Sequence, residues 1–231
     1  MTKQTFDISV LDFLERLEFK QKLPPDISVM NPYKNASVME IVRKFYHKFY
    51  CDHYVRHLIL GINPGRLGAG ATGIPFTDTK RLESHCKIHF DGFRTHEPSS
   101  VFVYEMIDAS GGPEKFYQKF YISSVCPLGF TSSMNGKPIN YNYYDSALLR
   151  NAVKPFVIDM LNAQLNFGIS RQTCYVLGTG KNYQFVEELN STHHFFAKVV
   201  PLEHPRYIMQ YKSGKASEYI DKYLSAFAEL A

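Results

Sequence analysis

Two polar residues with the chemistry for hydrolysis stand where predicted buried strands end. Asn63 follows the apolar run at residues 58–60, inside the sequence Gly-Ile-Asn-Pro-Gly, and His204 follows an apolar run that begins near residue 195. An asparagine amide is too weak to act as a strong general base, but it can orient a water molecule. A neutral imidazole N–H can donate to a developing oxyanion. The two residues therefore suit a site that directs water at one atom and stabilises negative charge at another.

The segment that separates Asn63 from Phe76 is rich in glycine. A P-loop would require G-x-x-x-x-G-K-[ST], which the segment lacks, and a Rossmann site would require G-x-G-x-x-G immediately after a strand. Residues 61–70 match neither pattern; residues 68–73 have the glycine spacing of the second, but they begin six residues after the predicted strand at residues 57–62. A hydrolase with a serine nucleophile elbow is also excluded, because the chain contains no G-x-S-x-G pentapeptide. We therefore interpret the segment as a loop whose backbone approaches a ligand closely. Phe76, held by Ile74-Pro75, offers that ligand a flat face for stacking.

The elements that must position these residues alternate between strands and helices. Apolar runs predict buried strands at residues 57–62, 119–125, 173–180 and 195–205, whereas residues 77–113 are predicted to be irregular. Apolar residues at helical spacing predict helices near residues 10–17, 145–165, 182–189 and 219–227. A further helix is predicted to open at the capping box Ser37-x-x-Glu40. This alternation indicates an α/β fold with a parallel sheet covered on both faces.

The four predicted strands end in distinctive segments. These are Asn63-Pro64-Gly65, Ser124-Val125-Cys126-Pro127, Gly178-Thr179-Gly180 and His204-Pro205. In open parallel sheets the ligand site lies beyond the carboxyl ends of the strands. We therefore expect the four segments to face one crevice.

Length and composition restrict the class of protein. A chain of 231 residues with 45% hydrophobic and 21% charged residues is typical of a globular protein with one core. We expect a single domain over residues 1–231, with a helical region at about residues 1–50 packed on it. No apolar run approaches the roughly 20 residues needed to cross a bilayer, and the N-terminus lacks a signal-peptide core. We therefore expect a cytoplasmic protein with no membrane partner.

The cysteines and histidines give no sign of a metal site. The four cysteines form no C-x-x-C pair, and the nine histidines show no H-E-x-x-H spacing, so we expect neither metal nor cofactor. Cys126 and Cys174 lie in apolar runs and are predicted to be buried thiols. The net charge of +4 is weak evidence for any partner. Basic residues near Gly- and Pro-containing segments could be solvated or could converge on a polyanion.

The motifs around Asn63 and His204 resemble those of the uracil-DNA glycosylase superfamily, and most closely its single-strand-selective monofunctional branch. The first motif of that branch has the form G-M-N-P-G, a glycine-rich stretch, then T-G-V-P-F. This chain has Gly-Ile-Asn-Pro-Gly at residues 61–65 and Thr-Gly-Ile-Pro-Phe at residues 72–76, at the same separation. The family's strand ending Asn-x-Cys-Pro-Leu corresponds to residues 124–128, and its last motif begins His-Pro, as at residues 204–205.

This resemblance runs from about residue 40 to the C-terminus and has consequences for fold and activity. It implies a three-layer α/β/α sandwich with a central four-stranded parallel sheet. It also implies a monofunctional DNA glycosylase of base excision repair, which flips a damaged base out of DNA and removes it by hydrolysis. Uracil and related deaminated or oxidised bases would be the substrates, and an abasic site would remain. We expect such a protein to act as a monomer on single- or double-stranded DNA.

Roles for individual residues follow from the resemblance. Asn63 would position the water that attacks the sugar C1′, and His204 would stabilise negative charge on the leaving base. The base pocket would be formed by Phe76 as the stacking ring, Ser124 at the base edge, and Gly61, Ile62, Pro64 and Gly65. Contacts with DNA would come from Arg66, Arg206, Tyr207, Ile208, Lys212 and Lys215, and the segment after His204-Pro205 would fill the gap left by the base.

Two departures from the family pattern keep an alternative open. The asparagine that recognises the uracil edge in the family is Ser124 here, and the family's His-Pro-Ser-Pro loop becomes His-Pro-Arg-Tyr-Ile-Met at residues 204–209. The first departure bears on base specificity and the second on which side chain enters the helix. The alternative is a non-catalytic α/β protein that binds a nucleotide or damaged DNA, although the retention of Asn63 and His204 argues against it.

Overall fold

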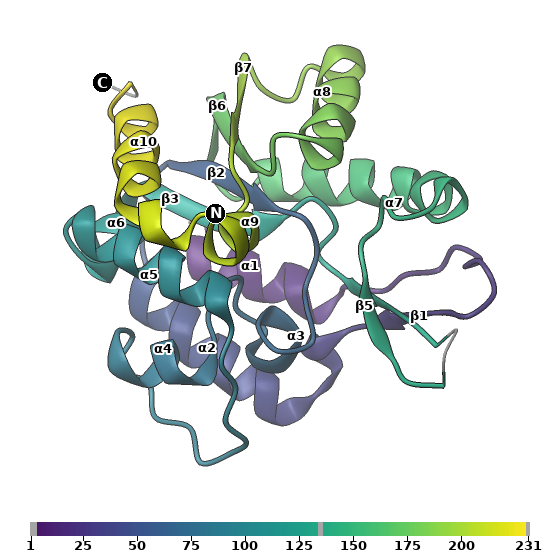
Figure 1. The fold of residues 1–231 in the computed structure, drawn as a ribbon, viewed down its shortest axis with the longest axis horizontal. Helices are drawn as coiled ribbons and strands as arrows, with labels where there is room; N and C mark the ends of the chain where they lie inside the picture. The colour runs from purple at the N-terminus through teal and green to yellow at the C-terminus, as the bar shows by residue number, and fades with distance from the viewer. Residues whose placement is uncertain (1–3, 134–135, 230–231) are drawn as a thin grey trace.

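The computed structural model describes residues 4–133 and 136–229 and is built around a four-stranded parallel sheet (Figure 1). The strand order is β3-β2-β6-β7. The strands are β2 (Arg56–Gly61), β3 (Phe120–Ser124), β6 (Ile169–Leu177) and β7 (Lys198–Leu202). With helices on both sides of the sheet, the predicted α/β/α sandwich is confirmed. Each strand overlaps the apolar run that predicted it, although β6 begins earlier than expected.

The helices include those that the apolar spacing predicted. Predicted helices are α1 (Phe6–Glu15), α2 (Ala36–Tyr50), α7 (Ala147–Leu165), α8 (Lys181–His193) and α10 (Ala216–Ala228). The helices that the apolar spacing did not predict are α3 (Ala69–Thr72), α4 (Thr79–Ser84), α5 (Pro98–Ala109), α6 (Pro113–Lys119) and α9 (Pro205–Tyr211), with 3-10 turns at Pro32–Lys34 and Ser213–Lys215. Among the described residues, no helix has the length and apolar character needed to cross a bilayer.

Alternating aromatic residues of β3 attach helices to both faces of the sheet. Successive side chains of a strand point to opposite faces. The Tyr121 ring centroid lies 5.3 Å from that of Phe6 in α1 and 6.0 Å from that of Tyr50 in α2. The adjacent Phe120 ring lies 4.5 Å from Phe227 of α10. The sheet is therefore covered by α1 and α2 on one face and by α10 on the other.

A second, antiparallel sheet was not predicted. Its strand order is β1-β4-β5, with β1 at Ile27–Met30, β4 at Gly129–Ser132 and β5 at Ile139–Tyr141. The strands are four, four and three residues long, and β5 is mostly exposed, so no apolar run marks them. Because β4 follows β3 after only residues 125–128, this sheet lies next to the carboxyl end of the parallel one.

The prediction that residues 77–113 are irregular was wrong, because they contain α4 and α5. The apolar residues of α5 do not form a single stripe, since the helix is buried around most of its surface. Its buried residues are Ser99, Ser100, Phe102, Val103, Tyr104, Met106 and Ile107. A helix of this kind lacks the periodic signal that revealed α1 and α2.

The predicted capping box at Ser37 was also wrong in position. The residue that caps α2 is Asn35, whose side-chain oxygen accepts hydrogen bonds from the backbone N–H groups of Ser37 and Val38. Asparagine is as good an N-cap as serine. With Ser37 as the N-cap the helix would begin at residue 38, whereas it begins at Ala36, two residues earlier.

A fully buried arginine at the start of β2 ties the sheet to the helices. Arg56 is 0% exposed, and its guanidinium donates to both carboxylate oxygens of Asp52 at 2.8 and 2.7 Å. Its Nε donates to the Tyr117 carbonyl at 2.6 Å. The guanidinium also lies 4.5 and 4.7 Å from the ring centroids of Phe6 and Tyr50. Because a buried charge is tolerated only when it is paired and hydrogen-bonded, this cluster fixes α1, α2 and α6 around β2.

Replacing Arg56 with methionine should lower the free energy of unfolding by about 3 kcal/mol or more, because the change leaves the partly buried Asp52 carboxylate and the Tyr117 carbonyl without their donor. Urea unfolding followed by circular dichroism measures this loss. Arg43→Met is the matched control, since Arg43 pairs with Glu15 at 2.7 Å but both side chains are about half exposed. The control should lose less than about 1 kcal/mol. Equal losses in the two variants would show that burial does not set the contribution of Arg56.

Candidate active site

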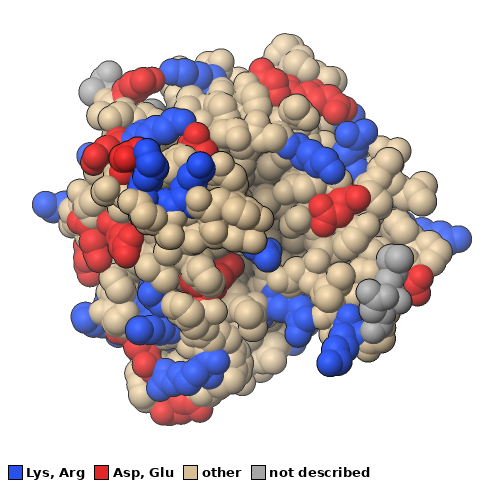
Figure 2. Space-filling view, in the orientation of Figure 1, with Lys and Arg blue, Asp and Glu red and all other residues tan. Residues whose placement is uncertain are grey.

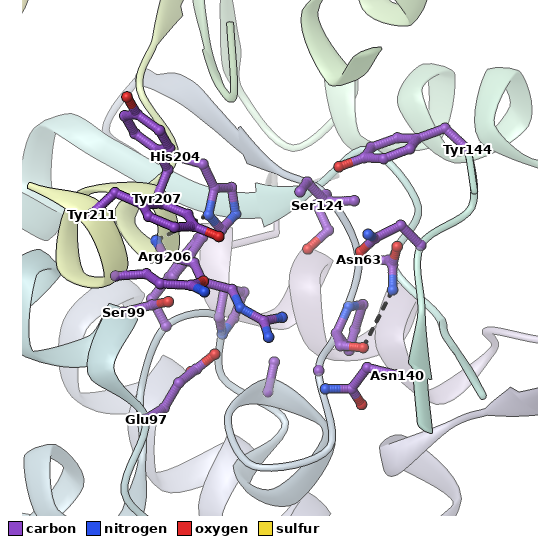
Figure 3. A pocket seen from close by; sticks show the side chains of 18 residues that line it. Asn63, Glu97, Ser99, Ser124, Asn140, Tyr144, His204, Arg206, Tyr207 and Tyr211 are labelled. Carbon is purple, nitrogen blue, oxygen red and sulfur yellow. Dashed lines mark hydrogen bonds between the residues drawn. The ribbon is translucent and has the colours of Figure 1, made fainter. Parts of the chain in front are cut away.

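A cavity of about 550 Å³ lies at the carboxyl ends of β2 and β3 (Figure 3). It brings together most of the predicted site residues. Those that line it are Ile62, Asn63, Pro64, Gly65, Phe76, Ser124, His204, Arg206 and Tyr207. Segments that are far apart in the sequence, from β2, β3 and the end of β7, therefore meet at one site, as the parallel topology predicted.

The Asn63 side chain is held by backbone groups on the far side of the cavity from His204 (Figure 3). Its Oδ1 accepts a hydrogen bond from the Tyr143 N–H at 3.1 Å, and its Nδ2 donates to the Tyr141 carbonyl at 3.3 Å and the Pro64 carbonyl at 3.4 Å. These bonds fix which atom of the amide is oxygen and where it points. Oδ1 retains a second lone pair that can accept a hydrogen bond from a water molecule.

The Phe76 ring is positioned by a close contact with the end of β2. A Cβ atom added to Gly61 would lie 3.0 Å from Phe76 Cε2, so any other residue there would displace the ring. Phe76 itself has a φ of 53°, in the left-handed region that bulky residues rarely adopt. Its ring centroid lies 5.7 Å from that of His204. Gly61 does not line the cavity, and its contribution is to leave room for Phe76.

The other loop glycines allow backbone segments to approach each other. A Cβ on Gly70 would lie 2.7 Å from the Gly65 carbonyl oxygen, to which the Gly70 N–H donates at 2.8 Å. A Cβ on Gly129 would lie 2.6 Å from the Pro64 carbonyl oxygen. The glycine-rich sequence is therefore explained by packing of the loop against itself and against β4. The sequence suggested that the loop backbone approaches a ligand closely. At Gly70 and Gly129 the close approach is instead to the protein's own backbone.

His204 is held as a neutral hydrogen-bond donor. Its Nδ1 accepts a hydrogen bond from the Arg206 backbone N–H at 3.1 Å. A neutral imidazole carries one ring proton, so that proton lies on Nε2. Burial lowers the pKa of His204 to about 4, and the Arg206 guanidinium acts in the same direction. At neutral pH the residue can therefore donate through Nε2–H without carrying a positive charge.

Ser124 ends β3 directly beside Gly61 of β2. The two residues are register partners, and two further backbone bonds, Val125 N–H to Gly61 and Cys126 N–H to Ile62, extend the pairing beyond the strands. Ser124 is 7% exposed, and its hydroxyl points into the cavity (Figure 3). A rotatable hydroxyl at this position can donate to or accept from a ligand.

Several residues that line the cavity were missed from the sequence. They are Glu97, Ser99, Asn140, Asn142, Tyr144, Gln210 and Tyr211, with Ala69 and Pro75. Three of them belong to the segment Ile-Asn-Tyr-Asn-Tyr-Tyr at residues 139–144, whose alternating amides and aromatic rings were the available signal. Ala69 and Pro75 lie in the glycine-rich segment between Asn63 and Phe76. The other four lie on α9 and at the start of α5, where no motif distinguished them.

Glu97 is the one carboxylate that lines the cavity among the described residues. Burial raises its pKa to about 6; the Ser100 hydroxyl and Arg206 oppose this shift, and the Asp78 carboxylate adds to it. The carboxylate lies against Gly68, where an added Cβ would be 2.0 Å from Glu97 Oε2. Figure 3 shows the Glu97 and Arg206 side chains extending toward the same part of the cavity.

The prediction that Ile208 contacts DNA was wrong. The segment after His204 is not a loop but the helix α9, and Ile208 faces its core side with an exposure of 0%. Tyr207, by contrast, is 43% exposed and lines the cavity. A helix turns by about 100° per residue, so adjacent residues cannot both enter DNA.

The predicted basic residues lie in different settings. Arg206 lines the cavity. Arg66 lies at its rim, where its guanidinium donates to the Pro138 carbonyl and its backbone N–H donates to Asn140 Oδ1 at 3.0 Å. Lys212 and Lys215 follow α9, outside the cavity, and Lys215 pairs with Glu218 at 3.4 Å. Figure 2 shows Lys and Arg interspersed with Asp and Glu on this face rather than gathered in one stripe.

Three further expectations concern the third strand end, metals and the buried thiols. The segment Gly178-Thr179-Gly180 does not line the cavity, although Gly178 lies beside His204, with 4.0 Å between its hypothetical Cβ and the His204 Cβ. Within residues 4–133 and 136–229, no group of three or more His, Cys, Asp or Glu side chains is arranged to hold a metal ion. Cys126 and Cys174 are buried, as predicted.

Comparison with known proteins identifies the family. A search of curated proteins finds no match. The crystal structure of wild-type SMUG2 from Pedobacter heparinus is similar to this chain, with a TM-score of 0.96, 55% sequence identity and coverage of 99% of both chains. The family model of the uracil DNA glycosylase superfamily matches residues 47–228, which include every residue of the cavity. The chain therefore belongs to the uracil DNA glycosylase superfamily.

Proposed function

We propose that this protein hydrolyses the N-glycosidic bond of uracil and related damaged bases in DNA and leaves an abasic site. The observation that supports this most directly is the pair formed by Asn63 and His204. Both side chains are fixed by backbone hydrogen bonds, and they face one cavity from opposite sides. The aromatic ring of Phe76 lies beside them. Such a cavity suits a planar base held between a water-directing amide and an N–H donor.

A base inside duplex DNA cannot reach this cavity, so the nucleotide must first be flipped out at a cost of a few kcal/mol. Phosphate contacts and a side chain that occupies the gap would offset the cost. In the flipped nucleotide, Asn63 directs a water molecule at C1′ while the base stacks on Phe76. As the glycosidic bond breaks, negative charge moves onto the base. His204 Nε2–H stabilises this charge, and it is most effective because its position is fixed beforehand.

The cavity also supports simple hydrolysis over a covalent mechanism. Among the described residues that line it, Arg206 is the only cation and there is no lysine. An amine nucleophile that forms a Schiff base with the sugar is therefore lacking at the site. The expected product is a free base and an intact abasic strand.

The alternative is a protein of the same fold that binds damaged DNA without cleaving it. Incubation with uracil-containing DNA, followed by alkali to break abasic sites, separates the two possibilities. Strand breaks that depend on both the protein and the uracil are expected. Binding of the same DNA without alkali-sensitive sites, across the panel of damaged bases described below, would favour the non-catalytic alternative.

Asn63→Ala should lower the single-turnover rate on the best substrate by about 10²-fold or more, as expected for the loss of one preorganised polar group. The dissociation constant for DNA should change little. The matched control is Asn142→Ala, because Asn142 also lines the cavity but its amide donates to Asp145 at 3.3 Å. Near-native cleavage by Asn63→Ala would remove Asn63 from the mechanism.

His204→Ala should slow cleavage by about 10²–10³-fold, and the loss should be smaller for 5-fluorouracil, which leaves as a more stable anion than uracil. An equal loss for both bases would indicate a structural role. Because the pKa of His204 is lowered to about 4, its protonation should not reduce the single-turnover rate between pH 8 and about pH 5.5. An acid limb near pH 6.5 that persists in Glu97→Gln would contradict a neutral His204.

Ser124 should allow broader base recognition than asparagine, because a hydroxyl rotates and leaves more space at the base edge. We expect cleavage of uracil and of at least one other base among xanthine, hypoxanthine and 5-hydroxymethyluracil. Ser124→Asn should shift the preference toward uracil. A panel of oligonucleotides, each with one modified base, measures both effects. Strict uracil specificity that is unchanged in Ser124→Asn would place the selectivity elsewhere in the cavity.

A further inference from the structure

The exposed side of α9 carries two tyrosines at the mouth of the cavity. Tyr207 and Tyr211 are 43% and 64% exposed, and their ring centroids are 5.6 Å apart with an interplanar angle of 45°. Both line the cavity, and Figure 3 shows them next to His204 and Arg206. Adjacent exposed aromatic rings that border a cavity mark a binding surface.

The burial of α9 fixes the direction of these rings. Pro205 and Ile208 are buried, and the helix packs against α5. At 100° per residue, Tyr207 and Tyr211 lie about 40° apart around the helix axis, and about 100° and 60° from the buried Ile208. The rings are therefore carried by a helix that is packed against the fold, so the backbone at these positions does not need to be ordered when a ligand binds.

The chemistry around the rings favours nucleic acid as the ligand. The sequence of α9 is Pro-Arg-Tyr-Ile-Met-Gln-Tyr, with no carboxylate, and it is followed by the exposed Lys212. A surface that combines aromatic rings with cations and an amide suits stacked bases and phosphates. It suits an apolar protein surface less well, because the cations would be buried without partners.

We propose that Tyr211, supported by Tyr207, is a stacking platform for the unpaired nucleobase adjacent to the flipped nucleotide on the same strand. The inference rests on the proposed function, because a flipped nucleotide in the cavity brings its neighbour to the cavity mouth. Stacking on tyrosine tolerates any base, since every base has a π face. The exposed Lys212 follows Tyr211 directly in the chain and would supply a cation for the phosphate of the same neighbouring nucleotide.

Fluorescence anisotropy with single-stranded oligonucleotides tests the platform without requiring cleavage. The probe carries 2′-fluoro-2′-deoxyuridine, whose glycosidic bond resists hydrolysis. Two further probes replace either the 5′ or the 3′ neighbour with a tetrahydrofuran residue that lacks a base. Tyr211→Ala should raise the dissociation constant for the intact probe by about tenfold, within the range for loss of one base–aromatic stack. For one of the two probes without a neighbouring base, the same substitution should have almost no effect.

Two variants serve as controls. Tyr211→Phe keeps the ring and should bind like the native protein, whereas a loss as large as that of Tyr211→Ala would assign binding to the hydroxyl and overturn the proposal. Tyr54→Ala removes a tyrosine that is 56% exposed before β2, at the opposite end of the strand from the cavity, and should change nothing. An equal effect of Tyr211→Ala on all three probes, or no effect on any, would also overturn it.

Failure of the stacking proposal can be distinguished from failure of the proposed glycosylase function. If the native protein does not release uracil from a cleavable oligonucleotide, the enzymatic proposal fails while the stacking test still has a result. If uracil is released but the effect of Tyr211→Ala on the dissociation constant does not depend on a neighbouring base, the stacking proposal is wrong and the glycosylase proposal is retained.

Discussion

The hydrogen bonds between the Asn63 amide and the backbone of residues 141 and 143 hold the candidate site together. They connect the loop after β2, in the parallel sheet, to the end of β5, in the antiparallel sheet. If they were absent, the amide could rotate and its free lone pair would lose direction. The close contacts of Gly61 with Phe76 and of Gly70 with the Gly65 carbonyl serve the same arrangement, because they pack the loop against β2 and against its own backbone. The orientation of the Asn63 amide thus depends on the contact between the parallel and the antiparallel sheet.

Two groups in the cavity, His204 and Glu97, have pKa values that are shifted in opposite directions. His204 has a lowered pKa, so the stability that its neutral form contributes is complete above about pH 6.5 and is lost as the pH falls toward 4. Glu97 has a raised pKa, so its contribution is complete below about pH 4.5 and is lost as the pH rises through about 6. At neutral pH the cavity therefore contains a neutral donor and an ionised carboxylate. That carboxylate would repel DNA phosphates unless Arg206, which faces the same part of the cavity, balances it.

The sequence was sufficient for features that rest on regular patterns. The four parallel strands are apolar runs, and α1, α2, α7 and α10 have apolar stripes, so their positions were predictable. The site residues at the ends of β2, β3 and β7 followed from the topology and from the family resemblance. The antiparallel sheet was not predictable because its strands are short and partly exposed. Ile208 was misassigned because His-Pro suggests a loop, whereas Pro205 is the first residue of a helix that turns the next apolar side chain inward.

The difference between binding a damaged base and removing it lies in how much of the site is fixed in advance. A protein that only binds a flipped base needs the Phe76 ring and hydrogen-bonding groups at the base edge, which Ser124 and the backbone could supply. It would gain little from an imidazole locked in one tautomer and kept neutral by burial, and little from an amide oxygen directed by two backbone segments. Those features are useful when charge develops and a water molecule must attack one atom, because they lower the energy of the transition state more than that of the bound substrate. The fixed orientations of Asn63 and His204 therefore favour an enzyme over a binding protein.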